Sequence, residues 1–358
     1  MQTKKPAKIK PVEIHFTFKG IPKKVLKVIK RIKKEGYSAY FVGGCIRDLL
    51  LGIQPKDFDI GTDATLEEVL EIFPKRSQII GKRFPIVHVY FDRSKKDFVE
   101  VTSFASPFED AFRRDLTINA LFYDPEEEKI IDYTGGLEDL KKGIIKVIGD
   151  PEERFKEDPV RMLRTVRHSA RLGFHIEQTT WKAILECRSL IKTVVWVRLR
   201  DEILKDIAGY WIKDWFNLMK HSGLLFEIYP FLRKKKKWDE KVLLKVLELL
   251  EKDNELSLSA RIALFLYPFL PFIEKPYDPL KFRKVPGIDR KEMLRLFWMF
   301  FFTFKFNKEL FERAMSILRD SYKIVYLLKR KHKISRRYRN REHFQESLKI
   351  AHHLLKLL

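Results

Sequence analysis

Cysteine is scarce in this chain, which contains only Cys45 and Cys187 among 358 residues. Two widely separated cysteines are too few for a disulfide framework or a zinc site, so we expect a protein of the reducing cytoplasm. Long apolar runs are also missing. None approaches the roughly 20 residues that span a bilayer, and the richest, 297–306, is interrupted by Lys305. The basic start at 1–5 has no apolar signal-peptide segment behind it, so we expect no membrane partner.

Acidic residues are few relative to basic ones. The chain has 49 Asp and Glu against 72 Lys and Arg, which gives a formal net charge of +23. Such an excess predicts a polyanionic partner, namely RNA, DNA or an anionic membrane surface. Hydrophobic residues make up 45% of the sequence, a globular proportion, and the length allows two or three domains. No feature indicates an obligatory protein partner.

Apolar periodicity divides the chain into a mixed α/β part and a helical part. The expected elements of the first part are helices over 22–34, 46–51 and 66–73 and strands over 40–42, 58–60, 86–91 and 98–101. Beyond Pro151 and Pro159 strand patterns nearly vanish, and helical patterns continue to the end. We therefore predict an α+β protein whose segments are a basic N-terminal stretch (1–24), an α/β head with a mixed or antiparallel sheet (25–148), an elongated all-helical neck (149–240) and a basic helical body (241–358).

Two glycines, Gly43 and Gly44, follow the strand pattern 40–42, and two aspartates, Asp57 and Asp59, come shortly after. Residues i and i+2 of a strand point to one face, so the two carboxylates can share a divalent cation. The glycines let the backbone approach a ligand closely, and the helix start offers N–H groups to a phosphate. Together they indicate nucleotide chemistry. A polar loop with an exposed D-x-D pair is an equally simple interpretation of these residues alone.

Two further segments of the head have both a chemical and a plain interpretation. Glu100 lies in the strand pattern 98–101 and could join the aspartates as a third acid, although an exposed strand glutamate is the simpler interpretation. The Gly- and Asp-rich segment 132–140 is expected to be a turn and helix cap rather than a direct participant in chemistry.

A third segment, 113–120, combines two arginines with polar side chains at helical spacing. Arg113 and Arg114 could contact a triphosphate. Asp115 and Asn119, at i and i+4, would share a helix face and could hold a ribose or orient an arginine. The alternative is a solvated helix with a local ion pair.

The order of these motifs resembles that of the bacterial class II tRNA nucleotidyltransferase/poly(A) polymerase family. The resemblance covers residues 25–235 and rests on G-G-x-x-R-D (43–48), D-F-D-I-G-T-D-A (57–64), R-R-D-x-T-I-N-A-L (113–121), D-x-x-G-G-x-x-D-L (132–140) and E-D-P-V-R-M-L-R (157–164). It implies a nucleotidyltransferase-type head followed by a helical neck and body.

The resemblance also implies roles for the head residues. Asp57 and Asp59 would bind two Mg²⁺ ions during in-line attack of an RNA 3′-hydroxyl on the α-phosphate of ATP, with pyrophosphate leaving. Glu100 would be a third acid near the metals. The residues implied in binding the phosphates and sugar of the nucleotide are Gly43, Gly44, Arg47, Arg113, Asp115 and Asn119.

Asp158 and Arg161 lie three apart at a predicted helix start and would share a face. A carboxylate acceptor beside a guanidinium donor can hydrogen-bond the edge of a base, whereas the plain interpretation is an i, i+3 ion pair. In the resembled family these two positions select the base without a nucleic acid template. Arg164, which we add to the nucleotide-binding set, and Arg167 continue the same side and could serve phosphate or RNA, or only cover the helix surface.

The segments 79–89 and 149–161 are closer to the poly(A) polymerase variants of the family than to the CCA-adding ones, which favours ATP over CTP. The chain is short for a poly(A) polymerase of this family, which favours tRNA as acceptor. We therefore expect transfer of AMP from ATP to an RNA 3′-hydroxyl, completing the terminal A of the tRNA CCA end. The alternatives are a poly(A) polymerase and a full CCA-adding enzyme that uses CTP and ATP.

Two rival classes remain open: a nucleotidyltransferase for a small molecule and a non-catalytic RNA-binding protein. The basic helical part argues against the first, because a small acceptor needs no such surface. Retention of Asp57, Asp59, Arg113 and Asn119 argues against the second.

The helical body carries a run of cations that would follow an RNA backbone without reading its sequence. The expected RNA-binding residues are Lys329, Arg330, Lys331, Arg336, Arg337 and Arg339. A second basic run covers 233–237. The aromatic cluster 297–302 is too dense for a solvent-exposed surface and is expected to be core.

Overall fold

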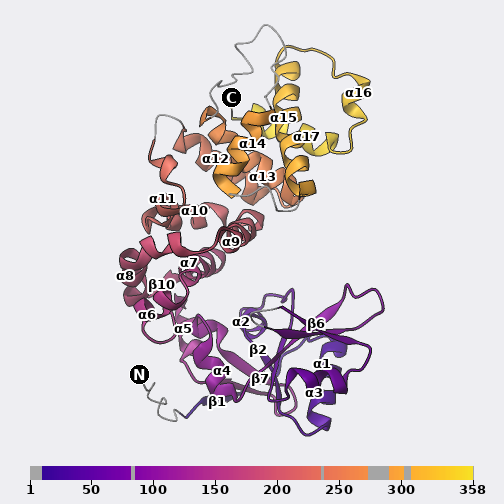
Figure 1. Cartoon of the computed structure of the whole chain (residues 1–358), viewed down its shortest axis with the longest axis vertical. Coiled ribbons are helices and arrows are strands. Elements are labelled where there is room, and N and C mark those ends of the chain that lie inside the picture. The colour runs from indigo at the N-terminus through magenta and orange to yellow at the C-terminus, as the bar shows by residue number, and fades with distance from the viewer. Residues whose placement is uncertain (1–9, 82–84, 235–237, 273–289, 302–307, 358) are drawn as a thin grey trace. The chain divides into compact units, whose positions relative to one another are not determined.

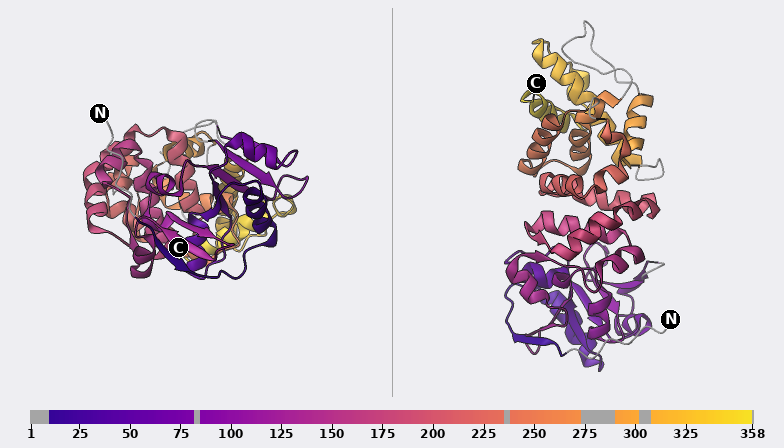
Figure 2. Two further views of the ribbon diagram at one scale, coloured as in Figure 1. Left: turned by 90° about the horizontal axis from the view of Figure 1, so that it is seen from below. Right: turned by 90° about the vertical axis from the view of Figure 1, so that its left-hand side faces the viewer.

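A computed structural model of the chain describes residues 10–81, 85–234, 238–272, 290–301 and 308–357 (Figures 1 and 2). It contains two compact units. The head unit comprises Met1–Arg154 with Phe174–Thr180, and the helical unit comprises Phe155–Gly173 with Trp181–Leu358. Within the described ranges, no helix combines the length and apolar character needed to cross a membrane.

The head unit is built on an eight-stranded mixed sheet. Its strands, in spatial order, are β1 (Val12–His15), β8 (Lys129–Asp132), β7 (Leu121–Asp124), β2 (Ala39–Val42), β3 (Asp59–Thr62), β6 (Phe98–Ser103), β5 (Ile86–Tyr90) and β4 (Ser77–Ile80). β3 and β6 run parallel, whereas the other paired neighbours of this sheet are antiparallel. The α+β class and the mixed sheet predicted from the sequence are thus confirmed. Sequence patterns predicted β2, β3, β5 and β6 but missed the other four strands, each only four residues long.

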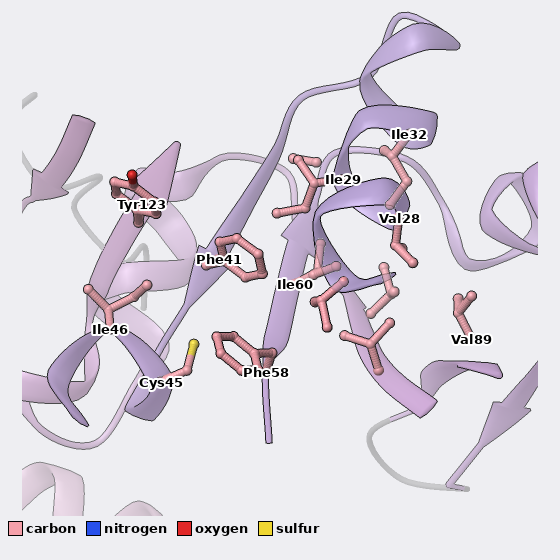
Figure 3. Close-up of a cluster of buried hydrophobic side chains, with 14 of the residues drawn as sticks. Val28, Ile29, Ile32, Phe41, Cys45, Ile46, Phe58, Ile60, Val89 and Tyr123 are labelled. Carbon is pink, nitrogen blue, oxygen red and sulfur yellow. The ribbon is translucent and has the colours of Figure 1, made fainter. Parts of the chain in front are cut away.

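One face of the sheet packs against α1 (Lys23–Lys34) and α3 (Leu66–Ile72). α1 presents Val28, Ile29 and Ile32 to the strand residues Phe41 and Ile60, and all five are buried (Figure 3). On the other face, α4 (Pro107–Arg113) closes a second cluster that includes Val42, Phe104 and Phe122. Alternation along the strands therefore sends polar residues of β3 and β6 away from the α1 face.

The segment 132–140 is a structural support, as its turn-like composition predicted. Asp132 accepts hydrogen bonds from the backbone N–H groups of Thr134 (2.9 Å), Gly135 (3.0 Å) and Leu137 (2.9 Å) at the start of α5 (Gly136–Lys142). α5 packs against η1 (Thr117–Asn119), the 3₁₀ turn that ends with Asn119. The motif therefore fixes the position of η1 through α5. The same unit carries α2 (Gly44–Leu50) and β9 (Ile144–Ile145), which pairs in parallel with β10 (His175–Ile176).

Replacing Gly136 by alanine should unfold the head more easily than replacing Gly135. An added Cβ at Gly136 would lie 2.2 Å from the carbonyl oxygen of Thr117, so α5 and η1 must separate, at a cost of about 3 kcal/mol. At Gly135 no atom lies within 4 Å of the added Cβ, and only the left-handed backbone (φ +84°) opposes the change, at about 1 kcal/mol. Urea unfolding of both variants measures the difference, and equal midpoints would contradict the account.

The helical unit contains helices from α6 onward, and both α6 and α8 include residues of each unit. Their bounds are α6 (Pro151–Glu157), α7 (Val160–Leu172), α8 (Gln178–Cys187), η2 (Arg188–Thr193), α9 (Trp196–Ala208), α10 (Ile212–His221), α11 (Leu224–Ile228), η3 (Pro230–Arg233), α12 (Glu240–Lys252), α13 (Leu258–Leu266), η5 (Tyr267–Phe272), α14 (Arg290–Phe301), α15 (Lys308–Lys329), α16 (Arg336–Arg339) and α17 (Phe344–Leu355).

Aromatic side chains fill much of the core of this unit. Phe269 and Phe300 lie 4.5 Å apart between ring centroids, and Phe265 and Phe231 pack against Phe300. The prediction that 297–302 is core is confirmed for Phe297, Phe300 and Phe301, whereas Trp298 is half exposed and residue 302 lies outside the described residues.

Candidate active site

The carboxylates meet where β3 and β6 run side by side. The parallel register places Asp59 opposite Glu100, and Asp57 lies two residues before β3 begins. The sequence pattern predicted both aspartates within one strand. This is wrong, because β3 starts only at Asp59. Burial, together with the negative charge of Glu100 and a smaller repulsion from Asp57, raises the pKa of Asp59 to about 6, although the positive charge of Arg114 opposes the shift.

These acids suit a divalent cation that also contacts a phosphate. No three His, Cys, Asp or Glu side chains of the described residues are arranged as a complete metal site. Mg²⁺ commonly needs no such cluster, because one or two carboxylates and the substrate phosphates provide its protein and substrate ligands. The raised pKa of Asp59 is the observation that fits a cation here, since a positive charge would relieve the repulsion among the acids.

Gly43 brings the backbone close to this cluster. Its φ of +79° and ψ of −139° lie in a region that is essentially restricted to glycine. A Cβ at this position would lie 2.8 Å from Nη1 of Arg114 and 3.8 Å from Oδ2 of Asp59. Gly44 then begins α2. The sequence G-G thus creates a turn whose surface is backbone, immediately beside Asp59 and Arg114.

Arg114, rather than Arg113, is the arginine at the acids. Arg114 donates to Asp110 (2.8 Å) and to the carbonyl of Asn119 (3.2 Å), and its charge lowers the pKa of Asp59. Arg113 pairs with the same buried Asp110, but its side chain is 53% exposed. Adjacent residues on a helix end point in different directions, so the pair R-R in the sequence does not reveal which one faces the site.

Arg47 also differs from its predicted role. Its guanidinium is buried and donates to Asp48 (2.9 and 2.6 Å) and to Oδ1 of Asn119 (2.5 Å). The side chain of Asn119 in turn donates to Asp115 (3.3 Å). Arg47 therefore positions Asn119 from within the protein instead of presenting a free guanidinium to a triphosphate. The predicted shared helix face of Asp115 and Asn119 is wrong, because Asp115 lies in the loop between α4 and η1, yet the two side chains do meet.

In the helical unit, Asp158 has a partner that sequence spacing did not indicate. Arg198, in α9, donates to both oxygens of Asp158 at 3.0 and 2.8 Å. Arg161 instead pairs with Glu157 at 3.2 Å. The i, i+3 ion pair considered for Asp158 and Arg161 is thus replaced by two separate pairs. Arg198 lies 40 residues from Asp158 in the sequence. No local sequence pattern could therefore have identified it as the partner of Asp158.

Arg167 and Arg164 lie farther along α7 and belong to a different set of contacts. Arg167 is buried and donates to Asp206 (2.6 Å) and to the backbone carbonyl of Glu202 (2.8 Å). Burial alone would raise the pKa of Glu202, but the charges of Arg167 and Lys205 lower it, with a smaller contribution from Arg164. Arg167 is therefore a structural residue, and Arg164 lies near Glu202.

The predicted RNA-binding cations lie in α16 and at or just after the end of α15. Arg330, Lys331, Arg336 and Arg339 are exposed, Lys329 is half-buried at the end of α15, and the side chain of Arg337 lies outside the described residues. The guanidinium of Arg330 lies 4.9 Å from the ring centroid of Tyr326. The second basic run, 233–237, falls partly outside the described residues, since only 233 and 234 are covered.

Comparison with known families and solved structures identifies relatives of both units. Residues 39–108 and 95–146 match the family described as "Poly A polymerase head domain". Residues 173–236 match "Probable RNA and SrmB- binding site of polymerase A". Among solved structures, the Bacillus stearothermophilus CCA-adding enzyme in complex with CTP superposes with a TM-score of 0.65 and 28% identity, covering 94% of this chain and 76% of that one.

Curated relatives of two kinds are similar in sequence. Poly(A) polymerase I of Haemophilus influenzae is 36% identical over 252 residues, which is 63% of this chain and 55% of that protein. Poly(A) polymerase I of Salmonella typhimurium is 34% identical, with 74% and 64% covered. A CCA-adding enzyme of Geobacillus is 36% identical, with 66% and 58% covered. The chain thus spans between about half and two thirds of the length of these relatives.

Proposed function

Because the chain belongs to the family of poly(A) polymerases and CCA-adding nucleotidyltransferases, we propose that it transfers AMP from ATP to the 3′-hydroxyl of an RNA and releases pyrophosphate. The observation that supports this most strongly is the parallel register that sets Asp59 beside Glu100, with Asp57 at the strand entry. A shared acidic site beside a glycine turn and an arginine suits a reaction at a phosphate.

In this proposal the residues of the head site have separate roles. Asp57 and Asp59 would hold two Mg²⁺ ions, which would supply activation of the hydroxyl and neutralisation of charge on the phosphates. Arg114 and the backbone at Gly43 and Gly44 face the triphosphate. Arg47 fixes Asn119, which together with Asp115 is available to the sugar.

Base and acceptor selection are proposed for the helical unit. Asp158 and Arg161 read the edge of adenine, with the carboxylate of Asp158 held by Arg198. Arg164 contributes to nucleotide binding from the same helix. The exposed cations around α16 contact the RNA backbone, so their contribution should weaken as salt increases.

The acceptor we propose is tRNA that lacks its terminal A. The supporting observation is that the likeness to a CCA-adding enzyme extends over 94% of this chain, including the helical body. A second candidate is the addition of longer A tails to RNA, which the identity to poly(A) polymerases I favours.

A gel assay with defined acceptors separates these functions. Transcripts of one tRNA ending before CCA, after C and after CC, and an unstructured RNA, are each incubated with ATP or CTP. The proposal predicts one A on the CC-ending tRNA alone. Long tails on every RNA would establish poly(A) addition, and CCA on the first transcript would establish a complete CCA-adding enzyme. No addition to any RNA would contradict the proposed function.

Metal binding should decrease at acidic pH, and the pH at which it does so, here called the acidic limb, should depend on the ionisation of Asp59. A carboxylate must be ionised to bind a cation, and the pKa of Asp59 is raised to about 6. Binding of Mn²⁺, followed by electron paramagnetic resonance, should therefore weaken as pH falls below about 6. Since the charge of Glu100 contributes to the raised pKa, Glu100→Gln should move this limb to lower pH. An unchanged limb in that variant would show that Glu100 does not act on Asp59.

A further inference from the structure

A pair of aromatic rings continues the row of acids across the sheet. Val99 and Val101 of β6 and Val87 and Val89 of β5 are buried in the core beneath α1 and α3. The residues between them therefore face the opposite side. They include His88, which lies opposite Glu100 in the antiparallel register with its Nε2 3.4 Å from Oε1 of that residue.

Phe98 lies next to this histidine. The rings of His88 and Phe98 stack with centroids 4.0 Å apart and 11° between their planes. Phe98 is nevertheless 39% exposed, although it is a large apolar side chain. His88 falls within 79–89, the segment whose sequence favoured ATP, and the proposed reaction uses neither ring. An exposed ring that is already stacked on one side is a ready surface for a nucleobase.

A pocket of about 310 Å³ lies between the start of α1 and the residues where the chain enters β3 and β6. Asp57 and Phe98 both line it, together with Lys24, Lys56 and Lys96. Lys24 forms an ion pair with Asp97. Lys56 and Lys96 are exposed, and no acid of the described residues lies within ion-pair distance of either ammonium. Two uncompensated lysines beside an exposed aromatic ring have the composition of a single-stranded nucleic acid site.

The direction of the reaction decides which substrate belongs there. Gly43 follows β2, Asp59 begins β3, Glu100 lies in β6 and His88 in β5, and these strands are neighbours in that order. In an in-line transfer the attacking and leaving oxygens lie on opposite sides of the phosphorus. With the triphosphate at Gly43 and Arg114, pyrophosphate leaves on the β2 side, so the attacking 3′-hydroxyl approaches from the side of β6 and β5.

We infer that the His88–Phe98 pair and the adjoining lysine pocket bind the 3′-terminal nucleotides of the acceptor RNA. The exposed ring of Phe98 stacks on a base, His88 supports that ring and links it to Glu100, and Lys56 and Lys96 contact the flanking phosphates. This inference rests on the proposed function, because it takes its direction from the transfer to an RNA 3′ end. It assigns the acceptor end a place in the head that is distinct from the nucleotide-binding residues.

Equilibrium binding of an unreactive acceptor tests the inference directly. The probe is a CC-ending tRNA with a 3′-deoxy terminus and 2-aminopurine at the nucleotide before it, whose fluorescence is quenched when it stacks. Phe98→Ala should weaken RNA binding roughly tenfold or more and abolish the quench, whereas Phe98→Trp should retain both. The Kd for ATP should stay unchanged in each variant. The matched control is Phe16→Ala, which removes a similarly exposed ring (44%) elsewhere in the head and should change neither reading.

The lysines are tested by salt. Lys56→Ala and Lys96→Ala should each reduce the slope of log K for the same RNA against log salt by about 0.7. The inference is overturned if Phe98→Ala binds and quenches the probe like the unmodified protein. It is also overturned if the lysine variants weaken inhibition by pyrophosphate instead of RNA binding, since the pocket would then hold the leaving group.

Failure of the proposed function has a different signature. In that case the unmodified protein adds no nucleotide to any acceptor, yet the probe can still be bound and quenched through Phe98. Absence of RNA binding by the unmodified protein, in contrast, overturns the inference itself. Thermal unfolding of each variant shows whether the head remains folded, and Phe98→Trp keeps the test valid if Phe98→Ala does not fold.

Discussion

Replacing Asp59 by asparagine is expected to abolish AMP transfer and, at the same time, to stabilise the metal-free protein. The loss of rate should be at least about a thousandfold, the upper end of what removal of one preorganised electrostatic group costs. The gain in stability follows from burial and from the charges of Glu100 and Asp57, which raise the pKa of this carboxyl to about 6 from an ordinary 3.8. At neutral pH the folded protein therefore holds a costly charge, and removing it should contribute about 2–3 kcal/mol.

The sign of this linkage can be checked by titration. The folded state takes up a proton near pH 6 and the unfolded state only near pH 4, so the metal-free protein should gain stability as pH falls between these values. This pH-dependent gain should be missing from Asp59→Asn. Asp57→Asn is the matched comparison, because Asp57 is exposed. It should lose activity and gain much less stability than Asp59→Asn, because the charge of Asp57 is the smallest contribution to the raised pKa of Asp59. A metal-free Asp59→Asn protein that is less stable than the unmodified protein would contradict the conclusion that the charge of this carboxylate destabilises the folded protein.

Replacing Gly43 by alanine should reduce kcat/KM for AMP transfer by about a hundredfold, the scale expected when reacting groups are displaced by an ångström. The added methyl would lie 2.8 Å from Nη1 of Arg114, which must then move away from Asp59 and the carbonyl of Asn119. The positive φ of +79° adds backbone strain. Steady-state kinetics with ATP and tRNA measures the effect.

Gly52→Ala is the control for backbone strain alone. Gly52 also has a positive φ (+71°), but no atom lies within 4 Å of its added Cβ. This variant should be modestly destabilised and retain its activity. Equal losses of activity in the two variants would show that strain, and not the approach of the Gly43 backbone to Arg114, limits the reaction.

Local spacing was sufficient to predict much of the head. The glycine pair, the two aspartates and the strand around Glu100 could be found from alternation and turn residues, because each depends on neighbours in the chain. The sequence could suggest, but not establish, that Glu100 pairs in register with Asp59. Parallel strands are joined by a long connection, so their register leaves no local sequence pattern. The short strands β7 and β8 escaped prediction for a related reason: their burial depends on neighbours distant in sequence.

Arginine roles were the least predictable part of the site. Arg47 is buried against Asp48 and Asn119, Arg114 rather than Arg113 reaches the acids, and Arg198 holds Asp158. An arginine side chain is long, and its role depends on which acid it meets in the folded chain. Spacing along one helix cannot decide that. The stacking of His88 on Phe98 was likewise invisible, because it joins two strands through their pairing.

Release of pyrophosphate from ATP tests the central claim most directly. The protein is incubated with ATP, with and without Mg²⁺, and with CC-ending tRNA carrying either a 3′-hydroxyl or a 3′-deoxy terminus. The account predicts pyrophosphate in equal amount to the AMP incorporated, only when Mg²⁺ and the 3′-hydroxyl are both present. Pyrophosphate release that persists without RNA or with the 3′-deoxy terminus, or no release under any of these conditions, would contradict it.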